Sequence, residues 1–248
     1  MTHPYDLLDL LAVSALVASA ALTARLVVWL PPHHLRAWLP WLQATAAGLL
    51  IGDALFHMLP ETMAHALSLS QVTLRVAIGI VGLLTVECIV RAISAANTTA
   101  TFAQMNIVGD ALHHFVDGIV IGASFAIDRT LGLVVALAIL AHELPREMGN
   151  AGVLVAGGYA PRRAFALSVA TTAMLPLGAI SIVLIGHSPI FLGTSLAVAA
   201  GTTLYLACGD VLPGMWPSVG RGHRFTPALG VSAGLAFMWW AALIDHGH

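Results

Sequence analysis

Charge, lysine and cysteine are all scarce in this chain of 248 residues. Charged residues make up only 9% of it and all ten basic residues are arginines, whereas hydrophobic residues reach 58%. Because a soluble domain carries about 25% charged residues, this composition excludes a soluble or disordered protein, and the mean hydropathy of +0.89 agrees. A net charge of −2 without any basic run argues against nucleic-acid binding. Cys88 and Cys208 form no CxxC motif, which argues against a disulfide framework or a zinc knuckle.

Long apolar stretches take up most of the chain, and each is expected to cross a membrane as a helix of about 20 residues. Short turn-forming segments such as Pro31-Pro32 and Gly157-Gly158 separate them. The eight predicted spans cover residues 7–30, 41–65, 74–96, 104–127, 131–156, 163–186, 190–212 and 226–244. The start of the chain lacks the positive charge of a cleaved signal, so the first span is expected to be retained. The predicted fold is an all-α integral membrane protein, with residues 1–248 as a single transmembrane domain.

The arginines predict how the chain is oriented in the lipid bilayer. Odd-numbered connections and their flanking helix ends hold seven, namely Arg25, Arg36, Arg91, Arg162, Arg163, Arg221 and Arg224. Even-numbered connections hold only Arg75 and Arg129. Positively charged connections stay in the cytoplasm, so both termini are expected outside. The length and composition favour a bacterial inner (plasma) membrane.

Several ionisable residues lie inside the predicted spans, where each charge costs about 2.5–3.5 kcal/mol if it faces lipid. In the fourth span they recur at helical spacing, as Asp110, His113, His114 and Asp117. The second span carries Asp53, His57 and Glu61, the fifth carries His142, Glu143, Arg146 and Glu147 around Pro145, and the seventh carries Asp210. Proline kinks a helix, and kinked helices at membrane depth line cavities. We therefore expect these stripes to line one polar pathway, with Asp53 and His57 on its outer approach.

Imidazole and carboxylate groups at this spacing can bind a divalent ion. His113 and Asp117 lie one turn apart, and His142 can add a third ligand from the neighbouring helix. This ligand set suits Zn²⁺ and also Fe²⁺, Mn²⁺ or Cd²⁺. A buried polar network is the alternative for the two stripes, and a lone buried histidine is more often structural. Glu87 needs no ion, because Arg91 lies one turn further on and can pair with it.

An internal repeat relates the second and seventh spans. Ala47-Gly48 and Leu59-Pro60 match Ala200-Gly201 and Leu212-Pro213 at a constant offset, which places His57 on Asp210. The two helices are expected to run in opposite directions, so the repeat is inverted. Inverted repeats around a site at the midplane are a transporter architecture.

These motifs resemble those of the ZIP family of divalent-metal transporters. GDALHHFVDGIVIGASF, Gly109 to Phe125, resembles the family's HNxxDG signature, and HELPREMGN, His142 to Asn150, resembles HExPHExGD. GDALFHMLPE, Gly52 to Glu61, is similar to the second-helix motif. The resemblance covers all eight spans. It implies eight helices in a 3+2+3 inverted arrangement, outside termini, a homodimer and a transporter domain. It further implies Zn²⁺ as substrate with no organic cofactor.

Carried over by position, the resemblance implies a metal site at His113, Asp117 and His142, with Glu143 and His114 as further ligands. Arg146 departs from the family, which has Glu, His or Gln there, and a guanidinium cannot bind a cation. Leu175-Pro176-Leu177-Gly178-Ala179 resembles EPLGA but begins with leucine. Both departures fall on a second site, so we predict one bound ion and Arg146 as a tethered cation in the vacated place. Glu147, Asp110, Asp210 and Glu61 are expected along the pathway.

Three functions compete. The first is uptake of Zn²⁺ or a similar ion toward the cytoplasm, by alternating access or slow channel-like passage. The second is a membrane sensor, or an inactive relative, that binds metal without moving it. The third is an intramembrane metalloprotease, since His142-Glu143 begins an HExxH-like run. Its fifth residue is Arg146, so the two-histidine zinc site is broken. The chain is therefore not expected to be an enzyme.

Overall fold

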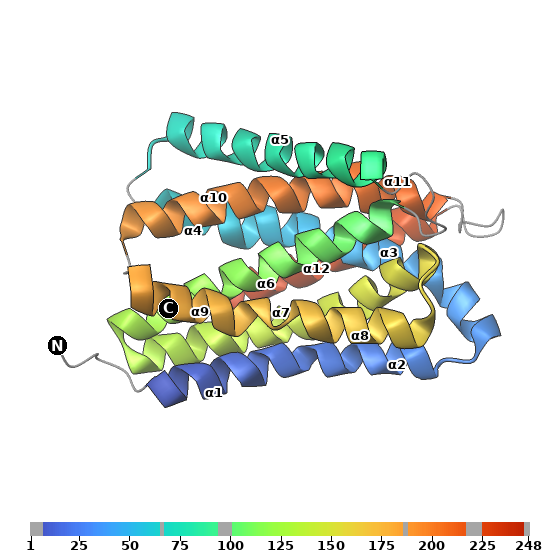
Figure 1. Cartoon of the computed structure of the whole chain (residues 1–248), viewed down its shortest axis with the longest axis horizontal. Helices are drawn as coiled ribbons and strands as arrows, with labels where there is room; N and C mark the ends of the chain where they lie inside the picture. Colours follow the sequence, from blue (N-terminus) through green and yellow to red (C-terminus); the bar gives the residue numbers. More distant parts are fainter. Residues whose placement is uncertain (1–6, 65–66, 94–100, 186–187, 217–224, 246–248) are drawn as a thin grey trace.

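All regular structure in the described part of the chain is helical. The computed structural model describes residues 7–64, 67–93, 101–185, 188–216 and 225–245, and the side chains of His142, Pro145 and Asp210 also lie outside the described part. The elements are α1 (Leu7–Ala18), η1 (Ser19–Thr23), α2 (Ala24–Trp29), α3 (Pro32–Asp53), η2 (Ala54–Met58), α4 (Leu59–Ala64), α5 (Leu69–Ile93), α6 (Thr101–Ile127), α7 (Arg129–Ala156), α8 (Pro161–Thr171), α9 (Met174–Ile185), α10 (Pro189–Tyr205), η3 (Leu206–Val211), α11 (Leu212–Met215) and α12 (Thr226–Asp245). They form one elongated bundle (Figure 1). The prediction of an all-α membrane fold is confirmed.

Seven helical stretches among the described residues are long and apolar enough to cross a membrane. They correspond to seven of the predicted spans, and the other predicted span, 131–156, corresponds to α7. This helix has 28 residues, or about 42 Å at 1.5 Å per residue. α1 begins and α12 ends at the same end of the bundle (Figure 1), as an even number of crossings requires. The arrangement supports the count of eight, which stays a prediction.

Two groups of helices make up the bundle. In one, α3 packs on α12 and α10 packs on α5; in the other, α6 packs on α7 and α9, while α3 joins the groups by packing on α7. Small residues let the backbones approach closely in a membrane. Between α6 and α9 the contact is reciprocal: a Cβ on Gly118 would lie 1.9 Å from the carbonyl oxygen of Leu175, and one on Gly178 would lie 1.9 Å from that of Phe115. Only glycine fits at this crossing.

The helices that carry the internal repeat share an irregularity. α3 passes into a π-helical turn at Ala54–Met58 and α10 into another at Leu206–Val211. The offset that takes Leu59 to Leu212 takes residues 54–58 into the second of these turns. The cause is local, because a proline follows each turn, and its ring clashes with the carbonyl one turn earlier and removes one N–H donor. Widening that turn relieves the clash. π-Turns are frequent at functional sites, and these two support the predicted repeat.

The hairpin of α6 and α7 holds most of the buried ionisable residues in the described part of the chain. Asp128 alone connects the two helices, and it caps the start of α7 by accepting hydrogen bonds from the backbone N–H groups of Thr130 (2.8 Å) and Leu131 (3.1 Å). The same N–H groups hold the pKa of the Asp128 carboxyl below its usual value. A one-residue connection leaves the helices antiparallel and adjacent, so their polar stripes can face each other.

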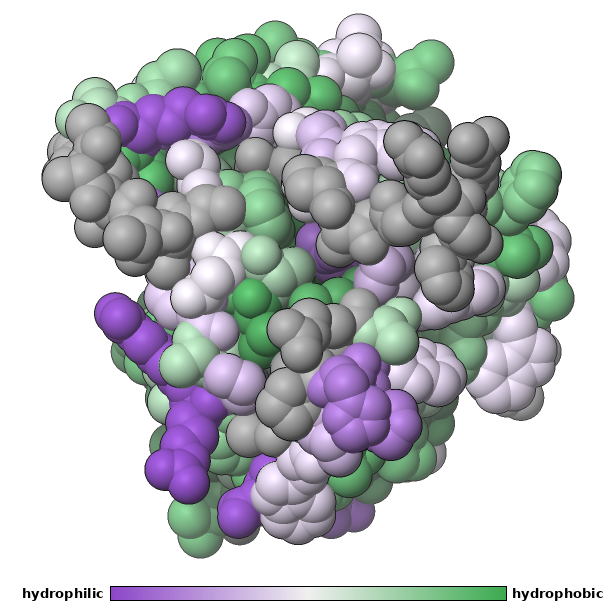
Figure 2. Space-filling model, turned by 90° about the vertical axis from the view of Figure 1, so that its right-hand side faces the viewer, coloured by the Kyte–Doolittle hydropathy of each residue, from purple (hydrophilic) through white to green (hydrophobic). Residues whose placement is uncertain are grey.

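Exposed arginines gather at one end of the bundle. Arg25, Arg91, Arg162 and Arg163 are exposed near the helix ends on the right of Figure 1. Figure 2 looks onto this end and shows hydrophilic side chains there, with hydrophobic ones around the sides. Because positive charge favours the cytoplasmic side, this end is the expected inner end.

The crossing of α6 and α9 predicts a stability effect. Gly118→Ala places a methyl group against a backbone carbonyl that has no room to move, and overpacking of this kind costs about 1–3 kcal/mol. The midpoint of thermal unfolding in detergent, followed by tryptophan fluorescence, should fall by several degrees. Gly82→Ala is the matched control, because a Cβ there meets nothing within 4 Å. Equal midpoints for the two variants would contradict the close crossing.

Candidate metal centre

The ionisable residues of α6 and α7 meet in the interior of the bundle. The residues of this polar cluster are at most 5% exposed, and they are Asp53, Asp110, His113, His114, Asp117, Glu143, Arg146 and Glu147. The stripe on α6 thus faces α7, as its spacing predicts. Burying these groups without partners would cost several kcal/mol for each charge. The cluster must therefore be neutralised from within or by a bound cation.

Three residues form a first group that could hold an ion. The ligand atoms of His113, Asp117 and Glu143 lie within 4.8 Å of one another. Nε2 of His113 is 3.6 Å from Asp117 Oδ2 and 3.5 Å from Glu143 Oε1. Ligands at about 2.0 Å from a tetrahedral zinc are about 3.3 Å apart, so these separations suit atoms that share one ion. This group contains two of the three ligands predicted for the site.

Asp110, His114 and Glu147 form a second group, whose ligand atoms also lie within 4.8 Å of one another. Nε2 of His114 is 3.0 Å from Glu147 Oε1 and 3.7 Å from Asp110 Oδ1. His114 thus belongs to this group, and its Nδ1 also lies 3.4 Å from Glu143 Oε2 of the first group.

The guanidinium of Arg146 lies between the two groups. It donates to Glu143 Oε2 (2.7 Å) and to Asp110 Oδ1 (2.7 Å), and it is 3.7 Å from Glu147 Oε1. One guanidinium nitrogen is also 3.4 Å from Nε2 of His114. Arg146 therefore contacts every member of the second group, where it supplies the positive charge that an ion would otherwise bring. Arg146 thus pairs with Glu143 of its own helix and with Asp110 of α6, and it lies close to Glu147.

The helix of the sixth predicted span is broken, and a hydroxyl group at the break contacts the polar cluster. It is divided into α8 and α9, which end and begin on either side of Thr172 and Ala173. Pro176 accounts for the break, because it cannot donate to the carbonyl one turn earlier. Thr171, the last residue of α8, donates its hydroxyl to Asp110 Oδ2. Leu175, where the family has glutamate, is fully buried in an apolar cluster with Ile121 and Phe125, so this helix offers no carboxylate at that position.

Asp53 reaches the cluster from the other group of helices. It is 1% exposed, and its Oδ2 lies 3.6 Å from Nδ1 of His113. Neither carboxylate oxygen has a hydrogen-bond partner in the described part of the chain. The structure thus places Asp53 at the cluster, deeper than the outer approach expected from the sequence.

Two cavities flank the cluster. One of about 190 Å³ lies between Asp117 and the expected outer end, and its walls include His57, Glu61 and Ser124. The other, of about 10 Å³, lies toward the expected inner end and is lined by Asn106, Asp110, His113, Arg146 and Asn150 among others. Asn106 donates its amide to Asn150 there and ties α6 to α7. The outer side is therefore roomier than the inner side.

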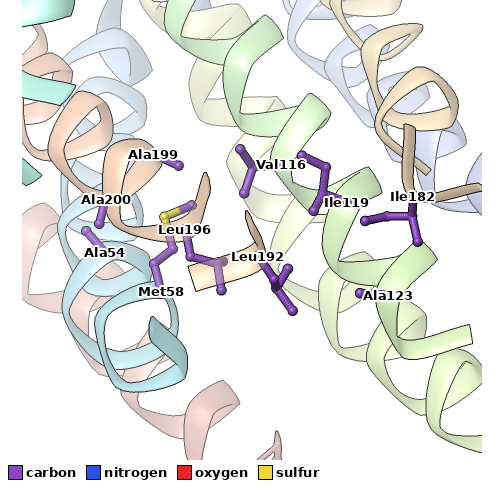
Figure 3. Close-up of a cluster of buried hydrophobic side chains, with 10 residues drawn as sticks. All are labelled: Ala54, Met58, Val116, Ile119, Ala123, Ile182, Leu192, Leu196, Ala199 and Ala200. Carbon is purple, nitrogen blue, oxygen red and sulfur yellow. The ribbon is translucent and has the colours of Figure 1, made fainter. Parts of the chain in front are cut away.

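Beside the outer cavity, side chains from both groups of helices pack together in an apolar cluster. Figure 3 shows Ala54 and Met58 beside Leu192, Leu196, Ala199 and Ala200 of α10, which face Val116, Ile119 and Ala123 of α6 and Ile182 of α9. Leu192, Leu196 and Ala123 also line the outer cavity. These side chains give that cavity part of an apolar wall.

The remaining site predictions have mixed outcomes. The side chains of His142 and Asp210 lie outside the described residues, so their roles stay predictions. Glu87 does pair with Arg91 (2.6 Å) and also accepts from Tyr205. Sequence reasoning missed Thr171 and Asn106, because short polar residues in a span carry no signal of their partners.

The chain matches one known protein family and is similar to several of its members. A family described as ZIP zinc transporters matches residues 93–242. "Zinc transporter foi" of Drosophila melanogaster is 33% identical over 153 residues, which cover 61% of this chain and 22% of that relative. Human "Zinc transporter ZIP4" is 39% identical over 108 residues, covering 44% and 17%, and human "Zinc transporter ZIP10" is 33% identical over 156 residues, covering 59% and 19%. The matched segment thus spans 17% to 22% of these relatives.

The position of Arg146 predicts that replacing this residue changes the number of Zn²⁺ ions bound per chain. Arg146→His removes the tethered charge and adds a ligand between two groups that are otherwise intact. We expect bound Zn²⁺, measured by elemental analysis after dialysis, to rise from one to two ions per chain. The control is Arg129→His, which alters an exposed pair with Asp9 and should leave the stoichiometry unchanged. One ion in both variants would contradict the assignment of Arg146 to a second site.

Proposed function

Because this chain belongs to the ZIP family of zinc transporters, we propose that it carries divalent cations across a membrane, with Zn²⁺ as the main substrate. One observation supports this best: the polar cluster holds five carboxylates against the single guanidinium of Arg146 among its described residues. Two histidines complete it. A buried excess of negative charge is stable only beside cations or protons. A divalent ion that passes through supplies that charge.

His113, Asp117 and Glu143 hold the ion in this proposal. Their nitrogen and oxygen ligands suit zinc and, less selectively, iron, manganese or cadmium. These three ligands leave one position of a tetrahedral zinc ion for a further ligand. His142, on the same helix as Glu143, is the fourth proposed ligand. Arg146 acts as the tethered cation and keeps the second group from capturing another ion.

The two cavities support a direction of travel. The ion enters through the outer cavity beside His57 and Glu61, whose imidazole and carboxylate attract cations. Val120, in the wall of that cavity, lies three residues beyond Asp117 on α6, or about 4.5 Å along the helix axis. Beyond the site, Arg146 and the pair of Asn106 and Asn150 narrow the inner side. Release toward the cytoplasm then requires these inner contacts to part.

A metal sensor is the competing function, because Arg146 closes the inner side of the site. A sensor binds the ion and passes none, so flux separates the two. The relatives bear transporter names, in agreement with the prediction that the chain is not an enzyme.

Flux measurements test the transporter. Purified protein in liposomes should carry Zn²⁺ inward, as reported by an enclosed fluorescent chelator. His113→Ala should reduce the flux at least tenfold, because His113 is the only histidine among the described members of the first group. His33→Ala is the matched control, since His33 is exposed at the start of α3, and it should carry Zn²⁺ at the parent rate. Tight binding without flux in the parent protein would favour the sensor.

A further inference from the structure

We propose that Asp53 is a positioning residue, which orients the His113 imidazole so that Nε2 faces the ion. The inference rests on the proposed metal site and adds a residue from the other group of helices to it. Asp53 ends α3, directly before the π-turn, whereas His113 lies on α6.

Opposite edges of the His113 ring face different carboxylates. Nε2 faces Asp117 and Glu143 at 3.6 and 3.5 Å, while Nδ1 faces Asp53 at 3.6 Å. The two nitrogens of an imidazole point away from each other, so an ion on Nε2 lies on the far side of the ring from Asp53. The geometry thus separates Asp53 from the ligands of the first group.

A carboxylate beside the ring nitrogen that does not bind the metal affects how a histidine binds its ion. Metal-binding histidines usually donate their other N–H to a carboxylate or carbonyl, which fixes the tautomer and raises the basicity of the bound nitrogen. The separation of 3.6 Å is slightly longer than a hydrogen bond, and a small rotation of the ring closes it. Since Asp53 has no hydrogen-bond partner in the described part of the chain, this N–H would also satisfy a buried carboxylate.

α3 packs closely on α12 directly beside Asp53. Gly52 packs against Met238 of α12, where a Cβ would lie 2.6 Å from the methionine Cβ. α3 therefore cannot move away from α12 locally without opening this contact. Asp53 is fixed relative to α12, while the ion ligands are fixed on α6 and α7. The orientation of His113 accordingly depends on how the two groups of helices fit together.

Zinc affinity, measured by competition with a chelator on the full chain in detergent, tests the proposal. Asp53→Ala should weaken binding about 10- to 100-fold, the usual effect of losing such a partner. Asp53→Asn removes the charge but keeps an oxygen that can accept from Nδ1, so it should restore most of the affinity. Equal losses in both variants would mean that only the charge matters, and would overturn the proposal.

A second measurement reads the histidine directly. The ¹⁵N chemical shifts of the His113 ring, assigned with His113→Ala, should show the proton on Nδ1 in the parent protein and a mixed population in Asp53→Ala. An unchanged tautomer would also overturn the proposal. Glu87→Gln is the matched control, because Glu87 is a buried carboxylate that pairs with Arg91 and Tyr205, and it should leave zinc affinity unchanged. A parent protein that binds no Zn²⁺ would instead contradict the metal site itself.

Discussion

Charge neutralisation inside the membrane is the constraint on which this structure depends. A carboxylate in a low-dielectric interior is stable only beside a positive charge or a proton, and α6 and α7 bring four carboxylates together, with a fifth, Asp53, from α3. Three features hold these groups in contact: the one-residue connection between α6 and α7, the helical spacing of the residues on each helix, and the glycine crossing of α6 with α9. The hydrophobic core clusters around it are apolar, so apart from Thr171, which donates to Asp110, the described residues offer these carboxylates few other partners. A cation that enters this cluster is stabilised by the same charges that destabilise the cluster without it.

Arg146 changes how that constraint is met. In the family pattern its position carries a residue that can bind metal, whereas here a permanent positive charge contacts Asp110, Glu143 and His114. The neighbouring changes are consistent with this charge. Leu175 removes a carboxylate from α9 and joins the apolar core. Asn150 stands where the HExPHExGD pattern has aspartate, and it pairs with Asn106 as a neutral amide. Where the family pattern has two carboxylates, this chain has leucine and asparagine, and it carries a fixed cation at Arg146.

The helices and their polar faces could be predicted from the sequence because both follow from local spacing. Period 3.6 fixes which residues share a face, and hydropathy fixes which stretches cross the membrane. Contacts between helices do not follow from spacing. His113 and His114 are neighbours in the chain, yet Nε2 of His113 faces Asp117, whereas Nε2 of His114 faces Glu147. The depth of Asp53 and the contact between Thr171 and Asp110 depend on how separate helices pack, which local sequence spacing does not show.

The two π-turns carry unlike side chains at equivalent positions of the predicted repeat. The offset that relates Leu59 to Leu212 takes Asp53 to Leu206. Asp53 lies beside His113, whereas Leu206 packs on Gly109 of α6, where a Cβ would lie 2.4 Å from its side chain, and it lines the small inner cavity. Equivalent positions on two helices with matching π-turns thus flank the cluster, one with a carboxylate and the other with an apolar side chain. The two helices thus share a backbone irregularity, but one presents a carboxylate to His113 and the other presents an apolar side chain to Gly109.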